Sequence, residues 1–208
     1  MDSSVEKLAR IQAEYRTPFY TTWTATLGPV NWANVFNTLY RNHRDKPTVD
    51  VIYTLIHNGT ISRTRMKAMG RQIEDQCPRC NSPRESQDHI FFTCPSSLEV
   101  WNIAEPYART LLAPDVISLQ RLILVGKDTG PLDHPCEDVR TALVGTIWKS
   151  RNSKLFEQKD TNLAQTFKSH LTGNLSLRAH SNILKGKDST FGFDQIAIDR
   201  NGKITLRF

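Results

Sequence analysis

Three cysteines and one histidine near the middle of the chain have the residue types and spacing of a metal site. They follow the pattern C-x2-C-x8-H-x4-C, formed by Cys77, Cys80, His89 and Cys94. Two cysteines separated by two residues can hold one metal ion from a single tight turn, and a later His and Cys complete a tetrahedron. Zn²⁺ favours thiolate and imidazole ligands, and four protein ligands leave no open position for a reacting water. The pattern therefore predicts a structural Zn²⁺ site rather than a catalytic one.

Other interpretations of these residues remain open. Cys77 and Cys80 are a possible redox pair, but a redox C-x-x-C opens a helix after a buried strand, whereas a polar stretch precedes this one. Cys80 and Cys94 are a possible disulfide, but the sequence starts with a charged, amphipathic segment and no secretory signal, which favours a reducing compartment. A set of buried thiols without metal is the third possibility.

Length and composition bound the class of protein. The 208 residues suffice for one large domain or two small ones. A net charge of +6 and a pI near 9.3 suit a polyanionic partner, although proteins that bind no nucleic acid are often as basic. Four Trp, nine Phe and five Tyr argue against wholesale disorder. Since no apolar run approaches the length of a membrane span, we expect an intracellular protein, nuclear or cytoplasmic, with no membrane partner.

Hydrophobic periodicity predicts a mainly helical chain. The expected helices cover residues 3–15, 31–40, 49–57 with Thr48 as cap, 63–69 with Ser62 as cap, 95–111, 136–158 and 161–185. Residues 18–33 are aromatic and turn-prone, and residues 115–125 fit a helix or a short strand equally well. Alternating apolar residues on both sides of Asn201-Gly202 predict a hairpin. Side chains expected in the core include Leu98, Trp101, Trp148, Leu155 and Phe156.

The expected architecture is a helical, bundle-like module organised around a CCHC zinc knuckle, with a small C-terminal β-hairpin. We divide the chain into four parts. They are an N-terminal helical and aromatic segment (1–46), a zinc-binding helical module (47–113), a C-terminal helical region (114–190) and the hairpin (191–208).

Several short motifs around the CCHC pattern occur together. They are the apolar segment Val49–His57, Gly59, Arg63-Thr-Arg-Met66, Cys77-Pro-Arg-Cys80, Glu85, His89-Ile-Phe-Phe-Thr-Cys94-Pro95 and Val100-Trp101. This arrangement resembles the zinc-binding region downstream of the polymerase in non-LTR (LINE-type) retrotransposon reverse transcriptases. The resemblance covers residues 47–101 well. Residues 139–157, with Ile147 to Asn152, are loosely similar to a helix that often follows in such proteins.

The resemblance implies a nucleic-acid-binding module without polymerase activity, since the sequence contains no Tyr-x-Asp-Asp motif. Its partner would be RNA or DNA. A protein-interaction module derived from a retroelement is the alternative, with the aromatic residues from Phe19 to Trp23 as its candidate contact.

Basic residues crowd the segment around the predicted metal site. The candidates for phosphate contacts are Arg63, Arg65, Lys67, Arg71, Arg79 and Arg84. A rigid knuckle that carries several cations can neutralise phosphates, although a solvated helix face would show the same pattern. Phe91 and Phe92 are able to stack on unpaired bases if exposed, but next to two metal ligands we expect them to pack the small core.

A Mg²⁺-dependent nuclease is the enzyme class to weigh. Asp115 or Asp138 with Glu157 and Lys159 would supply its acidic residues and lysine. Such sites place the Glu and Lys on a strand, whereas Glu157 ends a strongly helical segment, so we expect no enzyme activity. His134 and Cys136 are a further pair of metal-ligand types, but two residues alone make no site.

Overall fold

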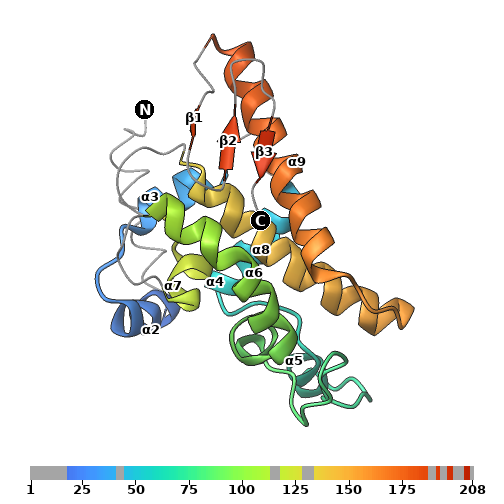
Figure 1. Cartoon of the computed structure of the whole chain (residues 1–208). Coiled ribbons are helices and arrows are strands. Elements are labelled where there is room, and N and C mark those ends of the chain that lie inside the picture. The colour runs from blue at the N-terminus through green and yellow to red at the C-terminus, as the bar shows by residue number, and fades with distance from the viewer. Residues whose placement is uncertain are drawn as a thin grey trace.

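The computed structural model describes residues 18–40, 45–112, 118–127, 134–186, 191–192, 196–198 and 204–206. This part of the chain is mainly helical, as expected (Figure 1). Its helices are α2 (Pro18–Leu27), α3 (Trp32–Leu39), α4 (Lys46–Ile56), α5 (Arg63–Ala68), the π-helix η1 (His89–Thr93), α6 (Pro95–Leu112), α7 (Leu119–Leu124), α8 (Cys136–Asn152), the π-helix η2 (Ser153–Glu157) and α9 (Leu163–Leu184). The helix predicted over residues 3–15 lies outside the described residues.

Helix α8 is the centre of the fold. It packs against α4, α6, α7 and α9, and every residue from Cys136 to Ile147 is buried. A helix that is buried on all sides must satisfy its polar groups within the protein. The guanidinium of Arg140, which is fully buried, does so by donating to the carbonyls of Ile123 (2.9 Å) and Leu124 (2.8 Å) and to the Glu137 carboxylate (3.0 Å). These bonds fix α7 against α8.

The N-terminal elements differ from the prediction. Residues 18–27 form helix α2 rather than a turn-prone stretch, because tertiary contacts stabilise it. Trp23 is buried, and its indole N–H donates to the carbonyl of Ile56 in α4 (2.8 Å). Helix α4 begins two residues before the predicted cap, since the side chain of Asp45 accepts the N–H of Thr48. Asp45 is therefore the N-cap, and Thr48 lies within the first turn.

Two side chains predicted in the core lie on the surface. Leu98 is 40% exposed because the neighbouring Ser97 occupies the buried side of α6, where its hydroxyl donates to the carbonyl of Ile90 (2.6 Å). Phe156 is 74% exposed because it lies in η2, whose wider turn changes the direction in which side chains point. Residues 119–124, which fit helix or strand by sequence, form α7 with Ser118 as N-cap.

A small antiparallel sheet lies beside α9. Its strands are β1 (Phe191–Gly192), β2 (Ile196–Ile198) and β3 (Ile204–Leu206), in the order β1-β2-β3. Ile196 pairs with Leu206 and Ile198 with Ile204, and β3 contacts α9. The sequence did not predict β1. The turn of the predicted hairpin, Asn201-Gly202, lies outside the described residues. In the described part of the chain, no helix combines the length and apolar character that crossing a membrane requires.

Candidate metal centre

The four predicted metal ligands lie together. The ligand atoms of Cys77, Cys80, His89 and Cys94 all lie within 4.8 Å of one another. The Sγ atoms of Cys77 and Cys94 are 4.0 Å apart, and Sγ of Cys80 is 3.3 Å from Nε2 of His89. Sulfur atoms at tetrahedral corners around Zn²⁺ are about 3.8 Å apart, given the usual Zn–S bond length. Three thiols and one imidazole at this spacing therefore fit Zn²⁺.

A tight backbone turn positions the first two ligands. The N–H of Asn81 donates to the carbonyl of Cys77 (2.9 Å), and the N–H of Cys77 donates to the carbonyl of Ser82 (2.8 Å). Asn81 has a φ of 58°, a left-handed conformation that asparagine tolerates better than most residues. The turn is thereby closed, and the thiols of Cys77 and Cys80 face the same point.

The π-helix η1 positions the other two ligands. Its i to i+5 bond runs from the N–H of Cys94 to the carbonyl of His89 (2.9 Å), which brings both residues onto one side. Nδ1 of His89 lies 3.4 Å from the hydroxyl of Thr93, so this nitrogen has a neighbour and Nε2 is left for the metal. The sequence identified both ligands but not the π-helix that aligns them.

The two buried thiols of the cluster differ in their pKa values, and only that of Cys94 is shifted towards the thiolate. A hydrogen bond with Cys77 lowers the pKa of the Cys94 thiol to about 7, and the same bond, together with burial, raises the pKa of Cys77 to about 12. The charge of Arg79 also lowers the pKa of Cys94. Three thiolates around Zn²⁺ carry a net charge of about −1, which a neighbouring guanidinium offsets. Arg79 is that neighbour, and its buried Nε has no hydrogen-bond partner among the described residues.

Comparison with known families agrees with this geometry. Residues 19–101 match the sequence profile described as zinc-binding in reverse transcriptase, and all four ligands fall inside this range. This segment is a reverse-transcriptase zinc-binding domain. Comparison with curated proteins and with solved structures found no match.

The zinc-binding domain of this chain is fastened to α8 through buried contacts. The carboxylate of Glu85 accepts from both Nη2 (2.7 Å) and Nε (3.3 Å) of Arg151, and both side chains are buried. The ring of Phe91 stacks on Trp148, with centroids 6.2 Å apart, and the Arg151 guanidinium lies 5.2 Å from the centroid of the Trp148 ring. Phe91 is thus a core residue, as predicted, and Phe92 is half-buried against the same core.

Arg79, a predicted phosphate contact, belongs to this junction. Its Nη2 donates to the carbonyl of Ile90 (2.8 Å), and its Nη1 lies 3.4 Å from the carbonyl of Ile147 and from the hydroxyl of Ser150. The side chain is half-buried. It therefore connects the zinc knuckle to α8. Reasoning from sequence gave no sign of this role, because the contacts join residues about 70 positions apart in the chain.

The remaining predicted basic residues lie at the protein surface around the metal cluster, and Arg63 is half-buried there. Two of their side chains bond to backbone carbonyls, Arg63 to Glu74 (2.6 Å) and Arg65 to Asn58 (2.7 Å). Lys67 pairs with Asp75 at 2.8 Å. Within the described ranges, no ion pair or hydrogen bond engages the side chains of Arg71 and Arg84, which are exposed.

The other candidate residues are dispersed. Asp138 is buried and bonds to Arg178, whereas Glu157 is exposed at the end of η2, 3.5 Å from Lys159. Asp115 lies outside the described residues. Nδ1 of His134 accepts the backbone N–H of Cys136 at 3.2 Å. Over the part of the chain that the structure describes, the CCHC cluster is the one group of His, Cys, Asp and Glu side chains close enough to hold a metal ion.

Proposed function

We propose that the zinc-binding domain binds RNA or DNA through the exposed cations of α5 and the loops beside the knuckle, without polymerase activity. The observation that carries this proposal is the position of Lys67, Arg71 and Arg84, which are exposed on a lobe that the metal site and α8 hold in place. A lobe fixed in this way presents its cations at constant spacing, so phosphates are neutralised with little ordering cost.

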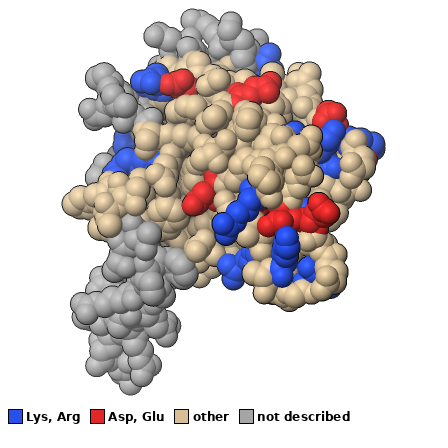
Figure 2. Space-filling model, turned by 90° about the horizontal axis from the view of Figure 1, so that it is seen from below, with Lys and Arg blue, Asp and Glu red and all other residues tan. Residues whose placement is uncertain are grey.

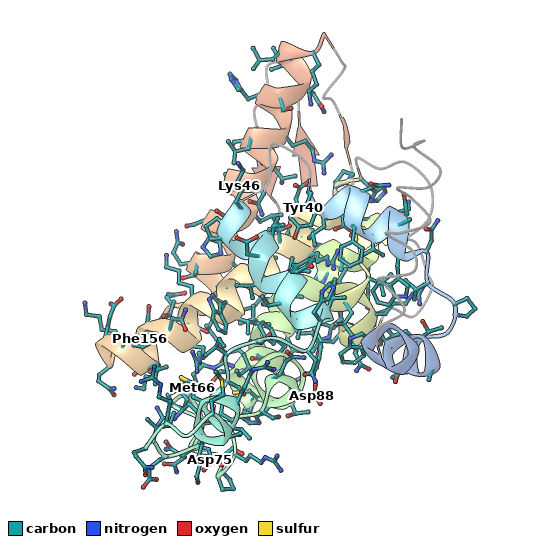
Figure 3. The ribbon with its side chains drawn as sticks, turned by 180° about the vertical axis from the view of Figure 1, so that it is seen from behind. Tyr40, Lys46, Met66, Asp75, Asp88 and Phe156 are labelled. Carbon is teal, nitrogen blue, oxygen red and sulfur yellow. The ribbon has the colours of Figure 1, made fainter. Side chains whose placement is uncertain are left out.

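The lobe is residues 60–94, which we call the zinc lobe; it lies at one end of the molecule (Figure 1). Figure 3 shows Met66 and Asp75 on this lobe. Basic and acidic side chains alternate on the face seen in Figure 2, rather than forming one broad basic patch. We therefore expect contact with a few phosphates and a modest dependence of affinity on salt.

The test compares two variants with the same change in charge. The first replaces Lys67, Arg71 and Arg84 together by Gln, and the matched control replaces the exposed Lys46, Lys149 and Lys185 by Gln. Affinity for labelled RNA and DNA is measured from low to high salt. The first variant should bind more weakly, and its plot of log affinity against log salt should be shallower by about 0.7–0.9 for each phosphate that the protein no longer neutralises.

Equal affinities for the first variant and the parent protein at every salt concentration would exclude this surface as the binding site. Arg63 and Arg65 stay unchanged in the test because their side chains bond to the backbone of the lobe. Incubation with Mg²⁺ should leave both nucleic acids intact, because four protein ligands leave the zinc no water to activate.

A protein-interaction role is the second candidate. It is favoured by two apolar side chains that are exposed on the zinc lobe, Ile61 at 47% and Met69 at 69%. A lobe that binds protein would lose its partner when Met69 becomes Gln, while the triple Gln variant would keep it. The two variants therefore separate the two roles.

A further inference from the structure

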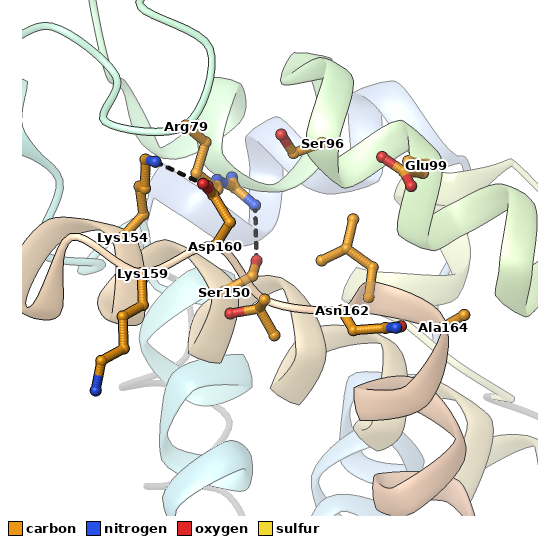
Figure 4. Close-up of a pocket in the computed structure, with 11 residues that line it drawn as sticks. Arg79, Ser96, Glu99, Ser150, Lys154, Lys159, Asp160, Asn162 and Ala164 are labelled. Atoms are coloured by element: carbon orange, nitrogen blue, oxygen red, sulfur yellow. Dashed lines mark hydrogen bonds and ion pairs between the residues drawn. The ribbon is translucent and has the colours of Figure 1, made fainter.

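A cavity of about 410 Å³ lies between the zinc lobe and the start of α9 (Figure 4). Its walls come from several parts of the chain, including Ser150 of α8 and the first residues of α9. The knuckle contributes Arg79, α6 contributes Ser96, η2 contributes Lys154, and the segment before α9 contributes Lys159. The cavity is open to solvent on one side and is distinct from the metal cluster and from the cations of α5.

The lining is rich in charged groups that solvent can reach. Three cations, Arg79, Lys154 and Lys159, face two carboxylates, Glu99 and Asp160. Asp160 pairs with Lys154 at 2.8 Å (Figure 4), but its side chain is 87% exposed. Exposed ion pairs contribute little free energy, so an anion is able to replace Asp160 beside Lys154. Lys159 is itself 74% exposed and lies 3.5 Å from Glu157.

Backbone donors add to the cations. Leu163 and Ala164 are the first residues of α9, a helix of 22 residues, and both line the cavity. The side chain of Asn162 accepts the N–H of Gln165 (2.9 Å), so the N–H groups of the two residues between them remain open to a ligand. Amide donors and lysines facing one cavity are the chemistry that recognises a phosphate group.

An exposed aromatic ring, Phe156, is close to this cavity in the chain and borders a neighbouring cavity that Trp148, Lys149 and His170 line. Phe156 lies between the two lysines in sequence, at the tip of η2, and is 74% exposed (Figure 3). An exposed ring of this size is suited to stacking on a base, and only an unpaired base offers its face. The ring therefore favours a single strand over a duplex.

We propose that this cavity binds a backbone phosphate of single-stranded nucleic acid, held by Lys154, Lys159 and the first amides of α9, while Phe156 stacks on a base. This proposal rests on the proposed function, because the same strand would run from the cations of α5 across the zinc knuckle to this cavity.

The first test removes the cations of the cavity. The probe is a fluorescent uridine 12-mer, and affinity is measured over a range of salt concentrations. Replacing Lys154 and Lys159 by Gln should make the plot of log affinity against log salt shallower by about 0.7, the value for one phosphate contact on a single strand. Replacing Lys46 and Lys185, which are exposed and line neither this cavity nor the one beside Phe156, should leave the slope at its parent value.

A second variant should have the opposite effect on affinity for the 12-mer. Asp160→Asn removes the carboxylate that competes for Lys154, so it should tighten binding of the 12-mer. Asp50→Asn, an exposed site on α4, is the matched control for the change in net charge. Tighter binding in both variants alike would overturn the role of Asp160 and, with it, that of the cavity.

A third readout locates the strand directly. Titrating the 12-mer into ¹⁵N-labelled protein should shift the amide signals of Leu163 and Ala164. Phe156→Ala should weaken binding of the 12-mer and leave binding of a duplex unchanged. Unshifted amides, or a Lys154/Lys159 variant with parent affinity and slope, would overturn the proposal.

The two proposals fail in different ways. If the cavity is wrong, the triple variant of Lys67, Arg71 and Arg84 weakens binding and the lysine pair of the cavity does not. If the α5 surface is wrong, the pattern is reversed. Measured zinc content and circular dichroism show whether each variant is folded before its affinity is compared.

Discussion

At the scale of single residues, the metal ligands give the sharpest prediction. Purified protein should contain about one zinc per chain, as a single four-ligand site requires. Cys77→Ser and His89→Ala should lose zinc and unfold more easily, because metal binding stabilises the folded zinc lobe relative to the unfolded chain. Metal analysis and thermal unfolding measure both effects.

Cys136→Ser is the matched control for these variants. Cys136 is buried in the first turn of α8 and lies outside the CCHC cluster, so its replacement should leave zinc content unchanged. Full zinc occupancy in a protein that carries both Cys77→Ser and Cys80→Ser would show that these thiols do not bind the metal.

His134 predicts a loss of stability in acid. Burial, together with the charges of Lys127 and Arg178, lowers the pKa of His134 to about 4. An unfolded histidine has a pKa near 6.5, so the contribution of neutral His134 to stability is complete above about pH 6.5 and is lost as the pH falls towards 4. His134→Asn keeps an acceptor for the N–H of Cys136 but does not titrate, so its stability should fall less steeply over this range.

Urea unfolding at a series of pH values checks this difference between His134→Asn and the parent protein. Both proteins release zinc in acid, so the comparison of their slopes removes that shared effect. His170, whose pKa burial also lowers, contributes acid sensitivity to both proteins equally. Parallel curves for the two proteins would mean that His134 has no part in the acid response.

At the scale of elements, the buried pair Glu85–Arg151 couples the zinc lobe to α8. Arg151→Met leaves the Glu85 carboxylate buried without its cation, which should cost about 3–5 kcal/mol of unfolding free energy. Adding Glu85→Gln should recover part of that loss, because it removes the unpaired charge. Urea unfolding of the single and double variants gives the coupling.

The exposed pair Lys67–Asp75 is the control for the buried one. It spans a similar distance, 2.8 Å against 2.7 Å, but the lysine side chain is 55% exposed. Asp75→Asn should therefore lower stability far less than Arg151→Met does. If Asp75→Asn and Arg151→Met lowered the unfolding free energy by similar amounts, burial of Glu85 would have no special effect.

The same elements show what sequence patterns can and cannot predict. Metal ligands are visible because their spacing is local, and Ser62 and Pro95 mark helix starts through local chemistry. The π-helices η1 and η2 left no such signal, since one extra residue per turn does not alter which residue types appear. The error at Phe156 follows from this, because a regular helix would have directed its ring inward.

At the scale of the whole molecule, long-range contacts account for most of what the sequence left open. The apolar residues of α8 were predicted in the core, but the partners of its charged residues were not. Asp138, for example, fits a nuclease by composition and lies in a buried pair with Arg178 in the fold. The sequence around a carboxylate does not show whether a cation 40 positions away neutralises it in the fold. The predicted domain boundaries stay predictions.

The junction with α8 also bears on which piece of this chain can be transplanted. The family profile ends at residue 101, whereas the partners of Glu85 and Phe91, Arg151 and Trp148, come more than forty residues later. A fragment that ends at residue 101 would contain all four zinc ligands. Its Glu85 carboxylate would, however, lack Arg151, and its Phe91 ring would lack Trp148. A fragment that keeps these contacts must therefore be longer than the segment that matches the family profile, and it must extend at least to Asn152 at the end of α8.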